Sequence, residues 1–168
     1  TSMKSVGEAM AIGRNFKESL QKALVSLEIG FSGLDRIFKF NKNQIEKKLK
    51  NNIPNKILLI AEAFRKKIDI KKIRKLSKID TWFLEQIKEI VDSENTIIKK
   101  GLPKNYIEFN KIKSIGFSDK KLSELTKIPE TVVRKKRNTL KVFPVFKKVD
   151  TCAAEFKSFT PYMYSTYQ

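Results

Sequence analysis

Apolar side chains recur at helical spacing near the start of the chain. The stretch over residues 15–28 has one apolar face, formed by Phe16, Leu20, Ala23, Leu24 and Leu27. Because spacings of three and four residues place side chains on one side of a helix, we predict an amphipathic helix here. Residues 29–43 contain two glycines and three phenylalanines without this spacing, and we expect an ordered connection.

Three further helices are predicted between residues 43 and 101. The first has Pro54 in its first turn and an inward face made of Ile57, Ile60, Ala61, Phe64 and Ile68. Asp69 is placed to cap the second helix, where Ile68 and Ile73 can form a hydrophobic staple. Asp80 is placed to cap a third, long helix that ends at Gly101. Its predicted inward face consists of Phe83, Ile87, Ile90, Val91 and Ile98.

An internal repeat follows this pattern. Residues 68–79 (IDIKKIRKLSKI) recur 49 residues later as residues 117–128 (FSDKKLSELTKI). In each copy a staple residue and a cap open a short helix, and a tight turn leads to a second helix at Asp80 or near Pro129. We therefore predict two helix–turn–helix hairpins whose stacking buries both apolar faces, with another helix over residues 104–114 between them.

The two ends of the chain lack helical periodicity. Residues 3–14 are rich in small side chains and are predicted to form a loop that runs into a short strand. Residues 142–146 are predicted to be extended, because Pro144 is excluded from a helix interior. The predicted fold class is thus all-α, a helical bundle of stacked helix–turn–helix hairpins with short extended segments at both ends.

Composition changes this picture little. The chain of 168 residues is 40% hydrophobic and 32% charged, which suits a globular domain with its own core. It begins at Thr1, so we expect a segment of a longer protein. It has no apolar run long enough to cross a membrane and no signal peptide, and we expect a cytoplasmic protein without membrane contact. The single cysteine, Cys152, excludes an internal disulfide and fits a reducing compartment.

The formal net charge of +18 suggests nucleic acid as a partner. All of the excess lies within residues 29–149, which hold 31 basic and 13 acidic residues. However, only six of the 36 basic residues are arginine, the side chain that reads base edges bidentately. We therefore favour a solvated lysine-rich surface without specific nucleic-acid binding. A nucleic-acid-binding helical module stays the alternative interpretation.

Catalytic constellations are missing from the sequence. The absence of histidine excludes catalytic triads and histidine-based acid–base chemistry, and with one cysteine it argues against a zinc site. The six glycines form no phosphate-binding loop. We expect neither catalytic nor cofactor- nor metal-binding residues in this chain. Trp82 and Phe83 are predicted to be core residues rather than a stacking platform, and Cys152 a small buried side chain rather than a reactive thiol.

Motifs at both ends carry a resemblance to a known family. Residues 1–14 (TSMKSVGEAMAIGR) and 18–24 (ESLQKAL) closely resemble the end of the first synthetase unit in carbamoyl phosphate synthetase large subunits. Residues 149–156 (VDTCAAEF) and 160–167 (TPYMYSTY) resemble the start of the second unit. Between them, the family's helical connector is similar to IAEAFR, IDTWFL and GFSDKKL, at residues 60–65, 79–84 and 116–122.

The resemblance implies a division of the chain and a function. Residues 1–28 would be the C-terminal end of the first (carboxyphosphate) synthetase unit, residues 29–149 a helical oligomerisation domain, and residues 150–168 the start of the second (carbamoyl phosphate) unit. The parent enzyme would make carbamoyl phosphate, for arginine and pyrimidine synthesis, from bicarbonate, ATP and ammonia. ATP would be used with magnesium or manganese by ATP-grasp units outside this chain.

The resemblance also implies partners and one site. The partners would be other copies of the large subunit and, through the rest of the parent, a glutaminase small subunit that releases ammonia from glutamine. Met3 and Glu8 occupy the positions at which the family's motif lies along an intramolecular tunnel. We therefore expect Met3 and Glu8 to line that tunnel, with a structural hydrogen-bonding role for Glu8 as the alternative.

Overall fold

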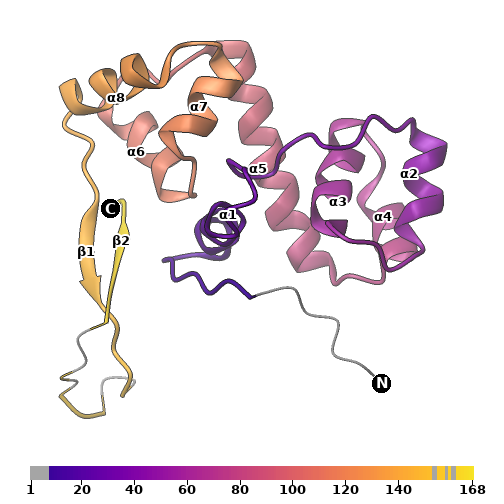
Figure 1. Ribbon diagram of the computed structural model, residues 1–168, viewed down its shortest axis with the longest axis horizontal. Helices are drawn as coiled ribbons and strands as arrows, with labels where there is room; N and C mark the ends of the chain where they lie inside the picture. The colour runs from indigo at the N-terminus through magenta and orange to yellow at the C-terminus, as the bar shows by residue number, and fades with distance from the viewer. Residues whose placement is uncertain (1–7, 153–154, 158, 160–161) are drawn as a thin grey trace.

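The computed structural model describes residues 8–152, 155–157, 159 and 162–168. This part of the chain forms eight helices and one small sheet, which confirms the predicted helical fold class (Figure 1). The helices are α1 (Phe16–Ser26), α2 (Lys42–Leu49), α3 (Lys56–Arg65), α4 (Ile70–Ser77), α5 (Thr81–Lys100), α6 (Tyr106–Ser114), α7 (Asp119–Thr126) and α8 (Glu130–Thr139). The strands are β1 (Val145–Lys148) and β2 (Met163–Thr166).

Local capping chemistry determines where the repeated helices begin and end. Asp69 and Asp80 each accept a hydrogen bond from the backbone N–H two residues ahead, as predicted. Ser118, which occupies the place of Asp69 in the second copy, caps α7 by accepting from the backbone N–H of Lys121, three residues ahead. Both short helices end at a lysine with left-handed backbone, Lys78 (φ 62°) and Lys127 (φ 60°). The two predicted hairpins are therefore present, and the turn between their helices has the same backbone form.

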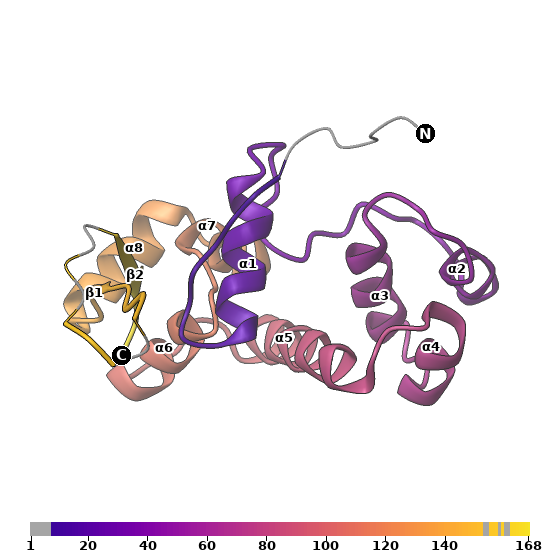
Figure 2. The same cartoon turned by 90° about the horizontal axis from the view of Figure 1, so that it is seen from below.

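Helix α5 is the centre of the molecule. It packs against α1, α3, α4 and α7, and Figure 1 shows α2–α4 around one end of it and α6–α8 around the other. In the turned view, α1 runs across α5 between these two groups (Figure 2). Because α5 is the second helix of the first hairpin and contacts α7 of the second, the two hairpins are joined through it.

The apolar face of α5 is rotated from the one predicted. Ile87, Ile90 and Val91 are buried as expected, but Phe83 and Ile98 are 42% and 55% exposed. Leu84 and Ile97 take their places in the core. The helix carries apolar residues on more than one side, so spacing alone did not identify the buried one.

Two details of α3 also differ from the prediction. Ile60, Ala61 and Phe64 are buried, whereas Ile57 is exposed. Pro54 precedes the N-cap residue Asn55 and so lies outside the first turn. The cause is the left-handed backbone of Asn55 (φ 58°), which delays the start of the helix.

The aromatic pair at the start of α5 is not core. Trp82 and Phe83 pack edge-on against the ring of Phe16 on α1, at centroid distances of 5.4 and 5.2 Å. Trp82 nevertheless keeps half of its surface exposed. The prediction of two core residues is therefore wrong, because this corner of the domain is covered on one side only.

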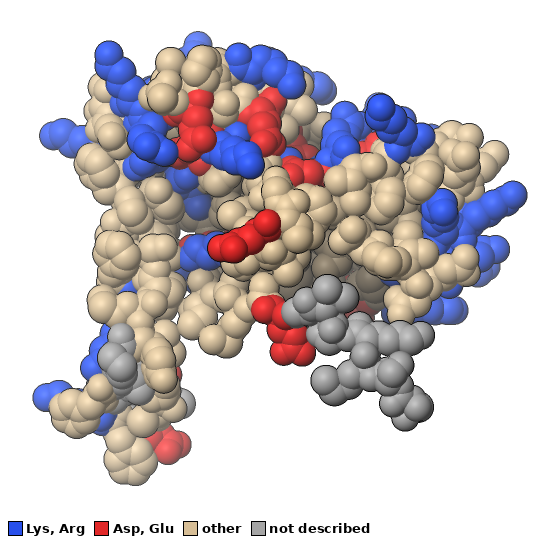
Figure 3. Space-filling view, viewed as in Figure 1, with Lys and Arg blue, Asp and Glu red and all other residues tan. Residues whose placement is uncertain are grey.

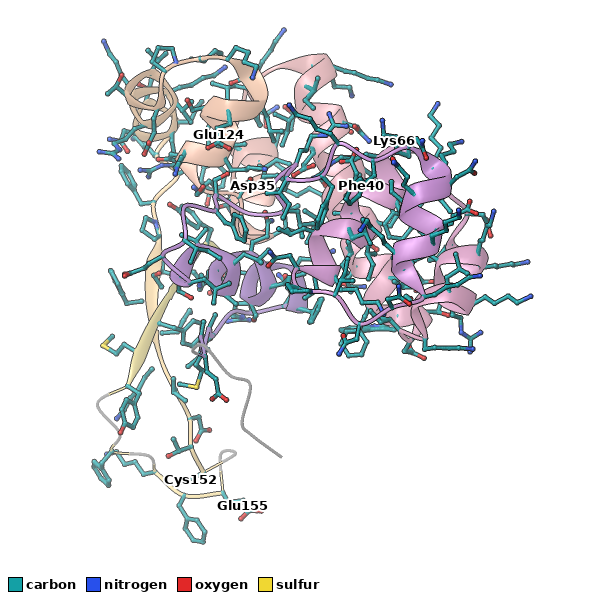
Figure 4. The ribbon with its side chains drawn as sticks, turned by 45° about the vertical axis from the view of Figure 1, so that its right-hand side comes forward. Asp35, Phe40, Lys66, Glu124, Cys152 and Glu155 are labelled. Carbon is teal, nitrogen blue, oxygen red and sulfur yellow. The ribbon has the colours of Figure 1, made fainter. Side chains whose placement is uncertain are left out.

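The ends of the described chain differ from each other. Residues 8–14 contain no strand, so the short strand predicted there is not found. At the other end, β1 and β2 pair antiparallel, with Val145 opposite Thr166 and Lys148 opposite Met163. This ribbon projects from the helical body (Figure 1). Cys152 lies near its tip (Figure 4) and is only half-buried, in contrast to the buried side chain predicted.

Among the described residues, no helix combines the length and the apolar character that crossing a membrane requires.

Candidate functional site

Helix α1 is fixed to the turn between α6 and α7 by polar contacts that its sequence pattern did not reveal. Asn15 donates its side-chain N–H to the carbonyl of Ser114 at 3.1 Å. Gln21 donates to the carbonyl of Ile115 at 2.8 Å. Gly116 (φ 98°) lies so close that a Cβ there would stand 3.0 Å from the Cα of Glu18. The inner face of α1 thus includes Glu18 and Gln21 beside Leu24, rather than apolar side chains alone.

Glu18 brings the two ends of the chain together. Its side chain is 1% exposed, and its Oε2 atom accepts hydrogen bonds from the backbone N–H of Arg14 at 2.7 Å and from the hydroxyl of Thr166 at 3.1 Å. Lys22, one turn further along α1, forms an ion pair with Oε1 at 2.8 Å. The same ammonium group donates to the carbonyls of Ile12 and Ser165. One carboxylate and one ammonium group therefore contact both residues 12–14 and residues 165–166.

A second charged cluster holds the residue after Thr166. The ammonium group of Lys113 lies over the ring of Tyr167, 5.0 Å from its centroid, and donates to Asp119 at 2.8 Å. Arg137 donates to the other oxygen of Asp119 at 3.0 Å. Burial would raise the pKa of Asp119, but the two cations outweigh it and the pKa is lowered. Burial lowers the pKa of Lys113, against the opposing charge of Asp119.

A buried ion network joins the connection between α1 and α2 to the core. Arg65 of α3 pairs with Glu94 of α5 at 2.6 Å and also donates to the backbone carbonyl of Leu34. Lys121 of α7 pairs with Asp35 at 2.6 Å and lies 3.5 Å from Glu94. The ordered connection predicted for residues 29–43 is therefore confirmed as far as Asn41, the N-cap of α2, and charged groups of α3 and α7 hold it.

A hydroxyl group completes this network on the α7 side. The Ser32 hydroxyl lies 2.8 Å from a carboxylate oxygen of Asp35 and 2.6 Å from one of Glu124, and Figure 4 shows Asp35 beside Glu124. Burial would raise the pKa of Asp35, but bonds from Lys121 and Ser32 and the charge of Lys121 outweigh it and the pKa is lowered. Because these carboxylates are already paired, their arrangement favours a structural role, in which they hold the chain in place, over a role in acid–base chemistry.

Most of the lysines and arginines lie outside these clusters. Figure 3 shows basic side chains over both ends of the body, around α7–α8 and around α2–α4, on the face drawn. In the described ranges no three acidic or sulfur side chains are close enough together to hold a metal ion. The described part of the chain thus has a lysine-rich surface, and buried ion pairs connect the elements of its core.

Comparison with known proteins identifies the fold's family. Residues 8–141 match the family model described as "Carbamoyl-phosphate synthetase large chain, oligomerisation domain". The chain belongs to this family. The match begins before α1 and ends after α8, so it includes the helices that enclose both charged clusters.

Large chains of the same enzyme are similar to this chain over its whole length. Large chains of carbamoyl phosphate synthase from Haemophilus ducreyi and Brucella melitensis are each 47% identical, over 100% of this chain. The arginine-specific, chloroplastic large chain of Oryza sativa is 45% identical, again over 100%. The chain spans only 15–16% of these relatives' own length. It therefore corresponds to one segment of a much larger protein.

The sites expected from the motifs lie at the margin of the described chain. Met3 falls outside the described residues. Glu8 is the first residue described and is exposed, in a segment without secondary structure. Its tunnel role stays a prediction. Glu18 and Arg65, which make the central buried contacts, were missed because their partners Thr166, Leu34 and Glu94 are distant in sequence.

Proposed function

We propose that this chain is the connector and self-association segment of a carbamoyl phosphate synthetase large chain. Residues 1–28 are the end of the first synthetase unit, residues 29–149 the oligomerisation domain, and residues 150–168 the start of the second unit. The observation that carries the proposal is the match of the whole chain to 15–16% of the length of large chains. Glu18, which touches both ends, supports a connecting role.

The parent protein would make carbamoyl phosphate from bicarbonate, ATP and glutamine-derived ammonia in the cytoplasm. ATP, with magnesium or manganese, would bind in the synthetase units on either side, and a glutaminase subunit would supply the ammonia. The product would serve arginine and pyrimidine synthesis. In this proposal the segment supplies no catalytic group, while Met3 and Glu8 lie along the tunnel at the edge of the first unit.

The partner of the oligomerisation domain itself would be a second copy of the large chain. Its charge opposes such contact, because residues 29–149 hold 31 basic and 13 acidic residues. Copies can approach only through apolar or locally balanced patches. Exposed apolar side chains of the helices, such as Ile107 and Ile98, provide surface of that kind.

The net charge of +18 favours a second candidate, a nucleic-acid-binding helical module. Against it, basic side chains are spread over both ends of the drawn face rather than gathered in one stripe (Figure 3).

Two assays test the proposed function. The full-length parent protein should form carbamoyl phosphate from bicarbonate, ATP and ammonia, while calorimetry of the 168-residue chain with ATP and magnesium should detect no binding. A parent protein that forms no carbamoyl phosphate would contradict the assignment. A saturable, micromolar ATP site in the chain would contradict the non-catalytic role.

A further inference from the structure

The base of the β1–β2 ribbon is held far more firmly than the rest of it. Thr166 is 1% exposed, although Met163 in the same strand is mostly exposed, as are Phe159 and Tyr162 before it. The ribbon therefore has one buried point of attachment within its second strand. That point is the Thr166 hydroxyl, which donates to Glu18 inside the helical body.

The atom that accepts this bond is shared with the other end of the chain. Oε2 of Glu18 accepts both from Thr166 and from the backbone N–H of Arg14. Gly13 stands so close that a Cβ on it would lie 2.9 Å from the same oxygen. A shift of either end would thus move or break a hydrogen bond to a buried carboxylate, which is costly because the group has no water to replace the lost partner.

Lys22 is a second side chain of α1 that binds both ends of the chain. Its ammonium group contacts Ile12 and Ser165 through their carbonyls and neutralises Glu18. A residue shortly before Arg14 and the residue directly before Thr166 are therefore also bound to one side chain. The two ends do not simply lie on the same helix; they share the same two charged groups of α1.

We propose that Glu18 is a positioning residue. It holds residues 12–14, at the end of the preceding segment, and residues 165–166, at the start of the following one, in one fixed relative arrangement. The helical body then acts as a rigid link, because α1 itself is immobilised on the α6–α7 turn by Asn15, Gln21 and the close approach at Gly116. The identity of the linked segments rests on the proposed function: they are the two synthetase units, and their relative placement would depend on one carboxylate.

The test separates this role from a general contribution to folding. Thr166→Val keeps the side-chain shape but removes the hydroxyl that reaches Glu18. Thr139→Val is the matched control, since the Thr139 hydroxyl bonds only to the carbonyl of Lys135 on an exposed turn of α8. Thr166→Ser restores the hydroxyl and should restore the wild-type behaviour.

Two readouts on the 168-residue chain are needed. Amide exchange over residues 163–166 should accelerate by about tenfold in Thr166→Val, as expected when a hydrogen bond to a charged group is lost, with no change in α3. Nitroxide labels on Met10→Cys and Met163→Cys, with Cys152→Ser, should give one narrow distance distribution that broadens in Thr166→Val alone.

Either readout can overturn the proposal. An unchanged distance distribution in Thr166→Val would show that Glu18 does not position the ends. Equal acceleration in α3 and β2 would show that Thr166 serves global stability instead. Both readouts are independent of carbamoyl phosphate synthesis, so a failure of the proposed function in the parent protein would leave them interpretable.

Discussion

Arg65 and Glu94 form an ion pair at 2.6 Å with side chains only 5% and 3% exposed. They come from α3 and α5, and Arg65 also bonds to Glu62 and to the carbonyl of Leu34. A buried pair of this kind adds little net stability over apolar residues, but it leaves an uncompensated charge when one partner is removed. The pair therefore fixes the α1–α2 connection in one position against the core.

Removing the arginine alone should be severe. Arg65→Met leaves Glu94 buried without its main cation, and we expect a loss of about 3–5 kcal/mol in unfolding free energy. Arg134→Met, which breaks the exposed pair with Glu130, should cost less than about 1 kcal/mol. Adding Glu94→Leu to Arg65→Met should recover part of the loss. Urea unfolding measures all three, and equal losses in the two single variants would mean that the buried pair is solvated in solution.

Acid should destabilise the domain through Asp35 and Asp119. The pKa of each lies below its ordinary value of 3.8 because of the cations beside it. Their contribution to stability is complete above that value and is lost as pH falls through the lowered pKa of the folded state. Asp119→Asn should therefore flatten the fall in the urea midpoint between about pH 5 and about pH 2. A variant with the same slope as the wild type would contradict the charge-based stabilisation of Asp119.

The close approach of α1 to the α6–α7 turn predicts a difference between two glycines. Gly116 (φ 98°) and Gly30 (φ 92°) share a positive-φ backbone that strains other residues, but a Cβ on Gly116 meets α1 at 3.0 Å and one on Gly30 meets nothing within 4 Å. Both substitutions to alanine should cost about 1–2 kcal/mol for the backbone. Gly116→Ala should cost about 1–3 kcal/mol more for the clash. Thermal unfolding of the two variants measures the difference in stability that this contact causes. Equal losses would show that α1 moves aside to accommodate the added Cβ.

The parts of the fold that local chemistry determines could be read from the sequence. Asp69 and Asp80 cap the helices they precede because a carboxylate bonds to backbone groups within two residues. Gly101 ends α5 because it adopts a positive φ (77°). These interactions depend on neighbours in sequence, so a single chain is enough to predict them.

The contacts that form the candidate site depend on distant partners. Glu18 meets Thr166 across 148 positions and Gln21 meets Ile115 across 94. Neither residue belongs to the apolar face that the sequence predicted for this helix, and a buried carboxylate becomes acceptable only once its donors are in place. The misassigned face of α5 has a related cause, since Phe83 and Ile98 are as apolar as the residues that are buried.

Non-specific DNA binding at low salt is expected from a net charge of +18 and carries no information. At about 0.2 M salt, the chain should bind a chosen duplex no more tightly than random DNA. Filter binding or fluorescence anisotropy with both duplexes measures the ratio. A preference of about a thousandfold, as specific DNA-binding proteins reach, would favour the nucleic-acid module instead.

Sedimentation equilibrium at low and moderate salt tests the central claim, that this domain associates with copies of itself. The repulsion between two highly basic copies acts over about 30 Å at 0.01 M salt and only about 8 Å at 0.15 M. If apolar patches form the contact, association should strengthen as salt rises, opposite to the trend for DNA. Dimers that dissociate on addition of salt would show that ion pairs drive the contact. A strict monomer at millimolar concentration in every salt would contradict the claim itself.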